Sequence, residues 1–363
     1  MDPIKLQAAI ELAGATWQAG ETSVSQLSLE EKQMLCGYTP GPGEPSLEEQ
    51  ERIASTASSK HAAFKASAAA SSFGYPASYD LRSGGFVTDV KNQGGCGSCV
   101  AFGTIATIEA TFRRQRNNPN LDVNLSEAHL YYGYAKAKGY TCRSGWRPDE
   151  ALEVSKQGIV DDACFPYTAG DQNCVLCSDW QNRLVKITGF KKISDIAAMK
   201  EWLSTRGALS ACFTVYNDFY SYGSGVYRHV TGASLGGHCV SIVGYDDNAG
   251  CWICKNSWGT GFGEQGFFKI AYGECGIESW TYGVEGILES GWQNNIKVRG
   301  LWANNSDLNS FVYLSEGIGW RRLCTTNVNA HLDMLSQLAS SKAQDHAVSV
   351  YQDNGIITQV YAW

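Results

Sequence analysis

The sequence predicts an α+β fold, in which a helical half precedes a β-rich half with a cleft between them, and a small β-rich domain follows. Residues 98–114 carry apolar side chains at helical spacing, whereas several short apolar runs bounded by turn residues follow Ala208. The length of 363 residues exceeds one ordinary hydrophobic core. We therefore expect two or three modules.

Composition narrows the classes of function. Hydrophobic residues make up 44% of the chain and charged residues 18%, which excludes a largely disordered protein. The formal net charge of −7 argues against nucleic acid or an acidic membrane as the main partner. No apolar stretch approaches about 18 residues, so we expect no membrane span. Residues 1–5 show no secretory-signal pattern.

Residues 1–74 form a leader whose residue pattern differs from that of the rest of the chain. Apolar residues recur at helical spacing over 4–17, and Ser28 and Ser46 each begin a helix-capping pattern on either side of a Pro/Gly-rich stretch. The Ala/Ser-rich residues 66–74 predict a mobile linker. Because these helices are too short to hold a core, we expect the leader to pack on the rest of the chain.

Residues 75–289 form the expected main domain and contain the helix at 98–114. Its β-rich half is predicted from four runs, at residues 209–216, 239–245, 252–255 and 266–272.

Residues 290–363 are the expected small β-rich domain. Strands are predicted at 296–302 and 310–314, then a helix with Leu332, Leu335 and Leu338 on one face, then a hairpin of 348–352 and 356–361. A small barrel of the oligosaccharide-binding type, a carrier module and a second cleavable piece are the alternatives for this tail.

The residues that carry chemistry begin with the cysteines. Thirteen is an odd number, so at least one thiol is not in a disulfide within the chain. Cys99 opens the helix predicted at 98–114, where the unpaired N–H groups and the helix dipole favour a thiolate. We therefore expect Cys99 to be a nucleophile.

A nucleophilic cysteine needs a base, and His238 is the best candidate among six histidines because it opens a buried strand-like run. Asn256 offers an amide that can orient the imidazole, and the indole of Trp258 can keep water away. Gln93 can donate to an oxyanion together with the Cys99 backbone N–H. These are the parts required for acyl transfer through a covalent intermediate.

Taken together, short runs resemble the papain family of cathepsin-like cysteine peptidases. The runs occur in the family's order, at residues 75–82, 90–99, 125–127, 237–238, 255–259 and 263–266. His238 and Asn256 follow Cys99 by 139 and 157 positions, a spacing of the kind that this family shows. The resemblance covers about residues 75–287 and is specific because the runs occur jointly.

The resemblance implies a two-lobed papain-like fold, with a helical lobe, an antiparallel β-barrel lobe and the active-site cleft between them. It makes Cys99 the nucleophile, His238 the base and later the acid, Asn256 the orienting residue and Gln93 the oxyanion donor. Trp258 then shields the bond between His238 and Asn256. The resemblance implies neither a cofactor nor a metal.

The resemblance also implies substrate contacts and partners. Ser144 and Gly145 form the wall along the substrate strand, whereas Trp146, Cys239 and Trp280 lie near the main specificity pocket. Cys96 and Cys142 are expected to form a disulfide. The partners are peptide or protein substrates and the chain's own residues 1–74, an inhibitory pro-segment released by cleavage in the linker; a permanently docked arm is the alternative.

Three departures from the family pattern are visible. Val100 follows the nucleophile where relatives usually carry Trp, and Ser144-Gly145 replaces a pair of glycines. The leader lacks the long charged helix pattern of many pro-regions. A secreted, periplasmic or lysosome-like compartment is favoured by the family and the cysteine usage.

The cysteines allow several other interpretations. Cys96 and Cys99 form a C-x-x-C pair typical of thiol–disulfide oxidoreductases, but such a site has no use for His238 and Asn256. The spacings at 174–177 and 251–254 invite zinc, yet the strand-like 251–254 places its cysteines on opposite faces. A disulfide within Cys164, Cys174 and Cys177 is the preferred hypothesis; Cys36 and Cys324 have no assigned role.

Other residues also have two interpretations. Glu109 is expected to be a buried structural carboxylate. The tail tryptophans, at 292, 302, 320 and 363, suggest either packing, which is preferred, or a sugar-binding surface. A transpeptidase or ligase would use the same catalytic residues, and a silent binding homologue would keep only the fold.

Overall fold

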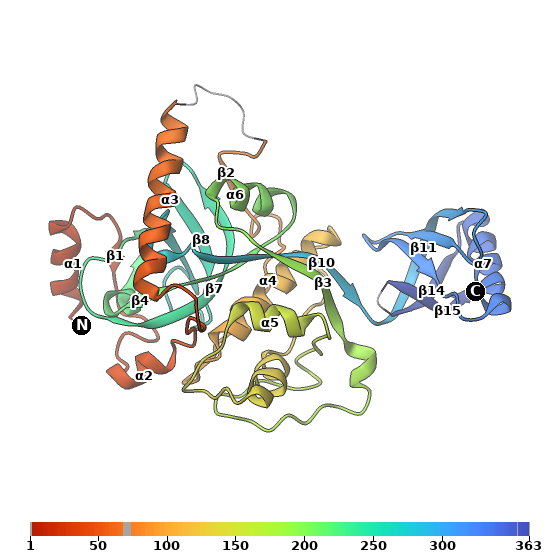
Figure 1. The fold of residues 1–363 in the computed structure, drawn as a ribbon, viewed down its shortest axis with the longest axis horizontal. Coiled ribbons are helices and arrows are strands. Elements are labelled where there is room, and N and C mark those ends of the chain that lie inside the picture. The colour runs from red at the N-terminus through yellow and green to blue at the C-terminus, as the bar shows by residue number, and fades with distance from the viewer. Residues whose placement is uncertain (1, 68–73, 354, 363) are drawn as a thin grey trace.

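The computed structural model describes residues 2–67, 74–353 and 355–362. The central part consists of a helical half and a β-rich half, the leader lies against it, and a small barrel extends from one end (Figure 1). Each half has a hydrophobic cluster of its own, and the barrel has a third. The predicted α+β, two-lobed class is therefore confirmed. Within the described residues, none of the helices combines the length and the apolar composition of a membrane span.

The helical half is built around α4 (Cys99–Gln115), with the π-helical η1 (His129–Ala135) and α5 (Pro148–Ser155) beside it. The sequence suggests a helix with one apolar stripe, but every residue from Cys99 to Phe112 is buried. The reason is that α4 lies between the two halves and contacts α5 as well as the sheet. The apolar stripe in the sequence predicts only one of the two buried faces of α4.

The β-rich half is one sheet in the order β3-β10-β4-β7-β8-β9-β6, with β2 paired to β7. The strands are β2 (Ser78–Asp80), β3 (Val185–Lys192), β4 (Leu209–Tyr216), β6 (Val226–Tyr227), β7 (Ser234–Asp246), β8 (Cys251–Lys255), β9 (Phe267–Ala271) and β10 (Trp280–Glu289). Helix α6 (Ile196–Thr205) packs against it. All four predicted runs of this half lie in strands, which confirms them.

The leader contains α1 (Pro3–Leu12), β1 (Gln18–Ala19), α2 (Leu29–Met34) and α3 (Leu47–Ser67). Ser28 caps α2 in a reciprocal capping box with Glu31, as the sequence pattern predicts. Strand β1 pairs with β5 (Tyr222–Ser224), and Trp17 is fully buried in the cluster of the β-rich half. Most of the predicted linker, residues 68–73, lies outside the described residues.

The tail is a closed five-stranded barrel with strand order β11-β12-β13-β15-β14. Its elements are β11 (Gly291–Ala303), β12 (Ser310–Leu314), β13 (Gly319–Leu323), α7 (Val328–Ala343), β14 (Ala347–Asp353) and β15 (Ile356–Ala362). Five strands in a barrel are also the arrangement of the oligosaccharide-binding type. The predicted apolar face of α7 was wrong at Leu332, which is exposed, because the buried stripe is displaced by one residue and includes His331, Met334 and Leu338.

Candidate active site

Cys99 is the first residue of α4, at the junction of the two halves. Its Sγ accepts hydrogen bonds from the backbone N–H of Gly37 at 3.2 Å and of Cys239 at 3.4 Å. The sequence favours a thiolate here, but burial beneath the leader raises the pKa of the Cys99 thiol well above its ordinary value. With the leader in place, burial therefore favours the neutral thiol.

His238 lies on β7 and reaches Asn256, which follows β8. The distance from His238 Nε2 to Asn256 Oδ1 is 2.7 Å, and because an amide oxygen only accepts, Nε2 carries the proton. This assignment leaves Nδ1 for proton exchange. The ring packs against Trp258, with centroids 4.8 Å apart. Burial lowers the pKa of His238 to about 4, although the Asn256 oxygen and the Leu35 carbonyl favour the charged ring.

Gln93 is fully buried, and its side chain is held from both ends. Its Oε1 accepts from Ser257 Oγ at 2.7 Å, so its Nε2 must donate; Nε2 lies 2.8 Å from Cys96 O and 3.2 Å from Leu35 O. Tyr167 also donates to the Gln93 carbonyl at 2.8 Å. Sequence analysis missed Ser257 and Tyr167 as positioning residues, although Ser257 stands next to Asn256 in the same motif.

Leader residues 35–38, which directly follow α2, cross this site. The Leu35 carbonyl accepts a hydrogen bond from Gln93 Nε2, and the Gly37 N–H donates a hydrogen bond to Cys99 Sγ. In the helical half, the Trp146 N–H donates to the Gly37 carbonyl at 2.8 Å. In the β-rich half, the Gly237 carbonyl accepts a hydrogen bond from the Tyr38 N–H at 2.9 Å. The leader thus presents the Gly37 N–H to the Cys99 sulfur.

Most of the predicted substrate-contact residues surround this peptide. Gly145 has a φ of +66°, and a Cβ there would collide with the Gly37 carbonyl. Tyr38 is buried in one hydrophobic cluster with Trp146, Cys239 and Trp280. Two predicted residues lie elsewhere.

Ser144 is the first exception, since its hydroxyl accepts from Thr141 N–H at 2.8 Å within a turn. Trp258 is the second. It is fully buried in the cluster of the β-rich half, where it covers His238. Its place therefore fits the shielding role and not a direct contact with substrate.

The disulfides separate the remaining cysteine hypotheses. Cys96 is bonded to Cys142 and Cys164 to Cys177, so Cys96 and Cys99 do not form a redox pair. Cys174 is a free, exposed thiol. Across the described ranges, no group of three or more His, Cys, Asp or Glu residues is arranged to hold a metal ion.

Cys36 and Cys324 remain free thiols. Cys36 Sγ lies 3.3 Å from Tyr220 Oη, and Cys324 Sγ lies 3.1 Å from Thr326 Oγ1. Burial raises the pKa of Cys36 to about 12, so this thiol is neutral in the docked leader.

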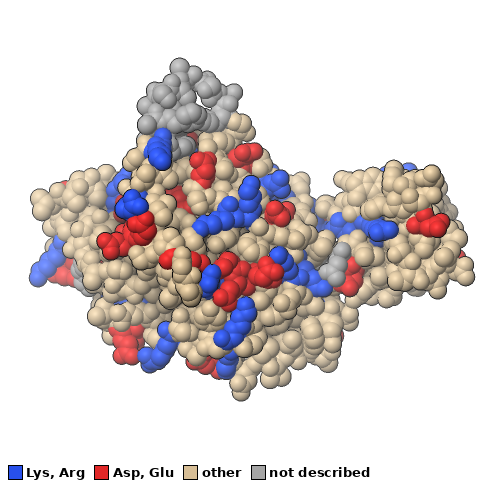
Figure 2. Space-filling view, viewed as in Figure 1, with Lys and Arg blue, Asp and Glu red and all other residues tan. Residues whose placement is uncertain are grey.

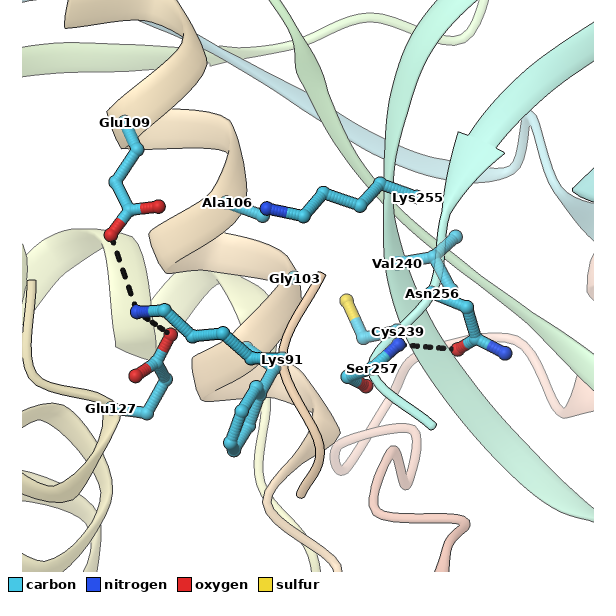
Figure 3. A pocket seen from close by; sticks show the side chains of 11 residues that line it. Lys91, Gly103, Ala106, Glu109, Glu127, Cys239, Val240, Lys255, Asn256 and Ser257 are labelled. Atoms are coloured by element: carbon cyan, nitrogen blue, oxygen red, sulfur yellow. Dashed lines mark hydrogen bonds and ion pairs between the residues drawn. The ribbon is translucent and has the colours of Figure 1, made fainter. Parts of the chain in front are cut away.

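A cavity of about 10 Å³ lies between α4 and the strands that carry the site (Figure 3). It holds about one water molecule, so it is not the peptide site. The charged side chains on its far side are structural. Glu109 accepts from Thr88 Oγ1 at 2.5 Å and from Leu125 N at 2.8 Å, and Lys91 bonds Glu127 at 2.7 Å. These contacts agree with the structural role expected for Glu109.

Comparison with known proteins gives one consistent family. The family described as papain family cysteine protease matches residues 75–284. Cathepsin B-like CP2 of Giardia intestinalis is 37% identical over 223 residues, covering 57% of this chain and 73% of that protein. Cathepsin B of Dictyostelium discoideum is 36% identical over 216 residues, covering 53% and 67%.

Solved structures agree on the fold. The procathepsin B S9 structure from Trypanosoma congolense has a TM-score of 0.61 at 24% identity, covering 78% of this chain and 98% of that one. The digestive procathepsin L2 structure from Tenebrio molitor larval midgut has a TM-score of 0.60 at 26% identity, covering 78% and 88%. This chain belongs to the papain family of cysteine proteases and is a cysteine peptidase in its zymogen form.

Proposed function

We propose that Cys99, His238, Asn256 and Gln93 catalyse hydrolysis of internal peptide bonds through an acyl-enzyme, and that residues 1–74 block this site until they are removed. The observation that carries the proposal is the leader peptide itself. Its Leu35 carbonyl accepts from Gln93 Nε2 while its Gly37 N–H binds Cys99 Sγ. The site thus already holds a peptide of the chain itself, in contact with both the nucleophile and the oxyanion donor.

The roles follow from the geometry. With the leader gone, Cys99 regains its position at an open helix N-terminus, and His238 can take its proton at Nδ1 while Asn256 holds Nε2. The thiolate attacks the substrate carbonyl carbon, and Gln93 Nε2 with the Cys99 N–H stabilises the oxyanion. Protonated His238 then gives its proton to the leaving amine.

The second half of the reaction uses the same residues. His238 accepts a proton from water, the resulting hydroxide attacks the thioester carbonyl, and the carboxylic acid leaves as Cys99 is regenerated. Ser257 and Tyr167 take no part in bond making; they hold Gln93 from its two sides.

The test replaces Cys99 and a matched thiol. In leaderless protein, Cys99→Ala should abolish hydrolysis of a peptide substrate and labelling by an epoxide thiol inhibitor. Cys174→Ala removes a free, exposed thiol outside the site and should change neither. Hydrolysis retained in Cys99→Ala, or lost in Cys174→Ala, would contradict the assignment.

Release of the leader is tested by mass. Intact-mass measurement during activation should show loss of about 74 residues from the N-terminal end, with activity rising in step. A full-length chain with full activity would leave residues 1–74 as a permanently docked arm. Two disulfides are typical of oxidising compartments, which supports a secreted, periplasmic or lysosome-like location.

A further inference from the structure

The barrel carries an unusual outer surface on strands β11, β12 and β13. The strand register places Gly300, Tyr313 and Trp320 in one row and Trp302, Phe311 and Arg322 in the next. Side chains two residues apart on a strand share a face, so both rows point outward, while Val312 between them is buried. We call Trp302, Phe311, Tyr313 and Trp320 the aromatic face.

Three of these rings are open to solvent in the structure. Trp302 is 47% exposed, Tyr313 42% and Trp320 50%, so neither the peptidase domain nor α7 covers them. This is the opposite of the packing role that the sequence favours for the tail tryptophans. A contiguous exposed apolar patch on a small domain marks an interaction site.

Packing between the rings makes the aromatic face a fixed surface. Tyr313 and Trp320 have centroids 5.3 Å apart, and Trp302 and Phe311 have centroids 5.6 Å apart. A Cβ at Gly300 would lie 3.2 Å from the indole of Trp320. The absence of a side chain at Gly300 therefore lets this indole lie across β11.

The charges around the aromatic face do not suit a polyanion. Residues 290–363 contain five Lys/Arg and five Asp/Glu, a formal net charge of zero. Lys297 and Arg299 on β11 are both paired with Asp345, and Arg321 is buried, which leaves Arg322 as the cation within the two rows. In the view of Figure 2 the barrel surface is mostly uncharged. A nucleic acid would require several phosphate-binding cations here.

Uncharged polar groups flank the aromatic face instead. The loop between β11 and β12 contains Asn304, Asn305 and Asn309, and the first two are exposed. Asn304 Oδ1 orders this loop by accepting from Asn309 Nδ2 at 3.0 Å and from the Ser306 N–H at 3.0 Å. Amides beside exposed rings offer hydrogen-bond donors and acceptors next to apolar planes.

We propose that the aromatic face binds an uncharged polysaccharide chain, with sugar rings stacked on Trp302 and Trp320 and hydroxyls bonded by the 304–309 loop. A sugar ring presents C–H groups on its faces and hydroxyls at its edge, which matches apolar planes bordered by amides. Barrels of this topology bind several kinds of ligand on this surface. The side chains, and not the topology, select an uncharged chain here.

The test is a depletion assay with the full chain carrying Cys99→Ala, to prevent self-cleavage. Insoluble cellulose, chitin and starch are the probes, and a soluble neutral glucan is used for titration. At least one should bind the chain, and Trp302→Ala with Trp320→Ala should weaken that binding roughly tenfold or more.

The matched control is Trp292→Ala. Trp292 is 45% exposed and packs against Tyr351 on another part of the barrel, so its loss should leave polysaccharide binding unchanged. Near-ultraviolet circular dichroism should show that all variants are folded.

Three outcomes would overturn the proposal. The first is no binding to any neutral polysaccharide, and the second is an equal loss in Trp292→Ala and in the Trp302/Trp320 variant. The third is binding of an oligothymidylate or of phosphatidylserine vesicles, sensitive to the Trp302/Trp320 change, without polysaccharide binding. Since the protein tested lacks Cys99, none of these results depends on the proposed peptidase mechanism.

Discussion

The leader and the barrel are both attached to the peptidase domain, but they are stabilised in opposite ways. The leader has no core of its own: its buried Ile10 and Trp17 belong to the cluster of the β-rich half, and its Tyr38 belongs to that of the helical half. The barrel closes around a separate cluster that includes Val312 and Leu338. The leader is stabilised by packing on the core of the peptidase domain, whereas the barrel is stabilised by a hydrophobic core of its own.

This difference has a functional meaning. A segment that folds only against the peptidase surface is ordered only while it is docked there, and while docked it can block the active site. A segment with its own core can be carried at a distance without affecting catalysis (Figure 1). The following experiments test this contrast, beginning with the largest expected effect.

Removing each addition in turn should separate the two roles. Cleavage in the linker followed by removal of the leader should raise peptide hydrolysis by at least about a thousandfold, the effect of an inhibitor bound by about 4 kcal/mol. Truncation after residue 289 of the activated enzyme should change the rate by less than about twofold. Loss of activity on truncation would show that the barrel supports the peptidase core.

Single core substitutions should repeat the contrast. Trp17→Ala and Leu338→Ala each remove a fully buried side chain, at costs of about 3–5 and about 2–5 kcal/mol. Trp17→Ala should raise the basal activity of the uncleaved chain, whereas Leu338→Ala should lower only the melting temperature of the barrel. Thermal unfolding and basal hydrolysis measured on both variants check this. An equal rise of basal hydrolysis in both variants would contradict the proposed difference between the leader and the barrel.

The blocking peptide itself is tested at Gly37. A Cβ at this position would collide with the Gly97 backbone, and overpacking of this kind costs about 1–3 kcal/mol. Gly37→Ala should therefore raise basal activity roughly tenfold in the uncleaved chain. Gly74→Ala, where a Cβ meets open space, is the control and should leave the zymogen silent.

Acid should loosen the leader. Burial lowers the pKa of His238 to about 4 in the docked state, and an exposed imidazole has a pKa near 6.5. Between these values only the released state takes up the proton, so docking is strongest above about pH 6.5 and weakens as pH falls toward about 4.

The measurement for this pH effect is the affinity of a separate leader peptide for leaderless Cys99→Ala protein. Adding His238→Gln should flatten the pH dependence. The same slope in both proteins would assign the effect to other groups, such as the leader carboxylates.

The smallest effect is expected from the ion pair between Glu44 and Arg147. It joins the leader to the helical half at 2.7 Å and is mostly shielded from solvent. Glu44→Gln should weaken docking by about 1 kcal/mol or less, measured as a small rise in basal activity. Glu30 forms an exposed pair with Arg143, so Glu30→Gln should have no measurable effect.

The residues proposed as catalytic were located from the sequence because each stands in a motif with a specific spacing. Cys99 opens α4 as the sequence predicts, whereas His238 does not open its strand: it lies inside β7, which begins at Ser234. The strands β4 and β8 followed from short apolar runs between turns. These are local signals, and the fold preserves them.

An inhibitory pro-segment was predicted, but the residues of it that cross the site could not be identified, because residues 35–38 act mainly through backbone atoms and carry no periodic pattern. The two-sided burial of α4 was also invisible, since its second face is covered by a distant strand. Strand β13 was missed for a related reason. Its outward residues include Trp320 and Arg322, and only the barrel shows that they share a face with Tyr313.

The long helix α3 separates the blocking peptide from the linker. Its 21 residues span about 30 Å, so a cut in the linker breaks no contact at residues 35–38. Cutting instead turns a tethered inhibitor into a free one, whose local concentration falls from an effectively millimolar value to that of the solution. Activation should then depend on protein concentration. A concentrated solution of cut protein stays largely inhibited, and the same protein becomes active on dilution because the cut leader dissociates.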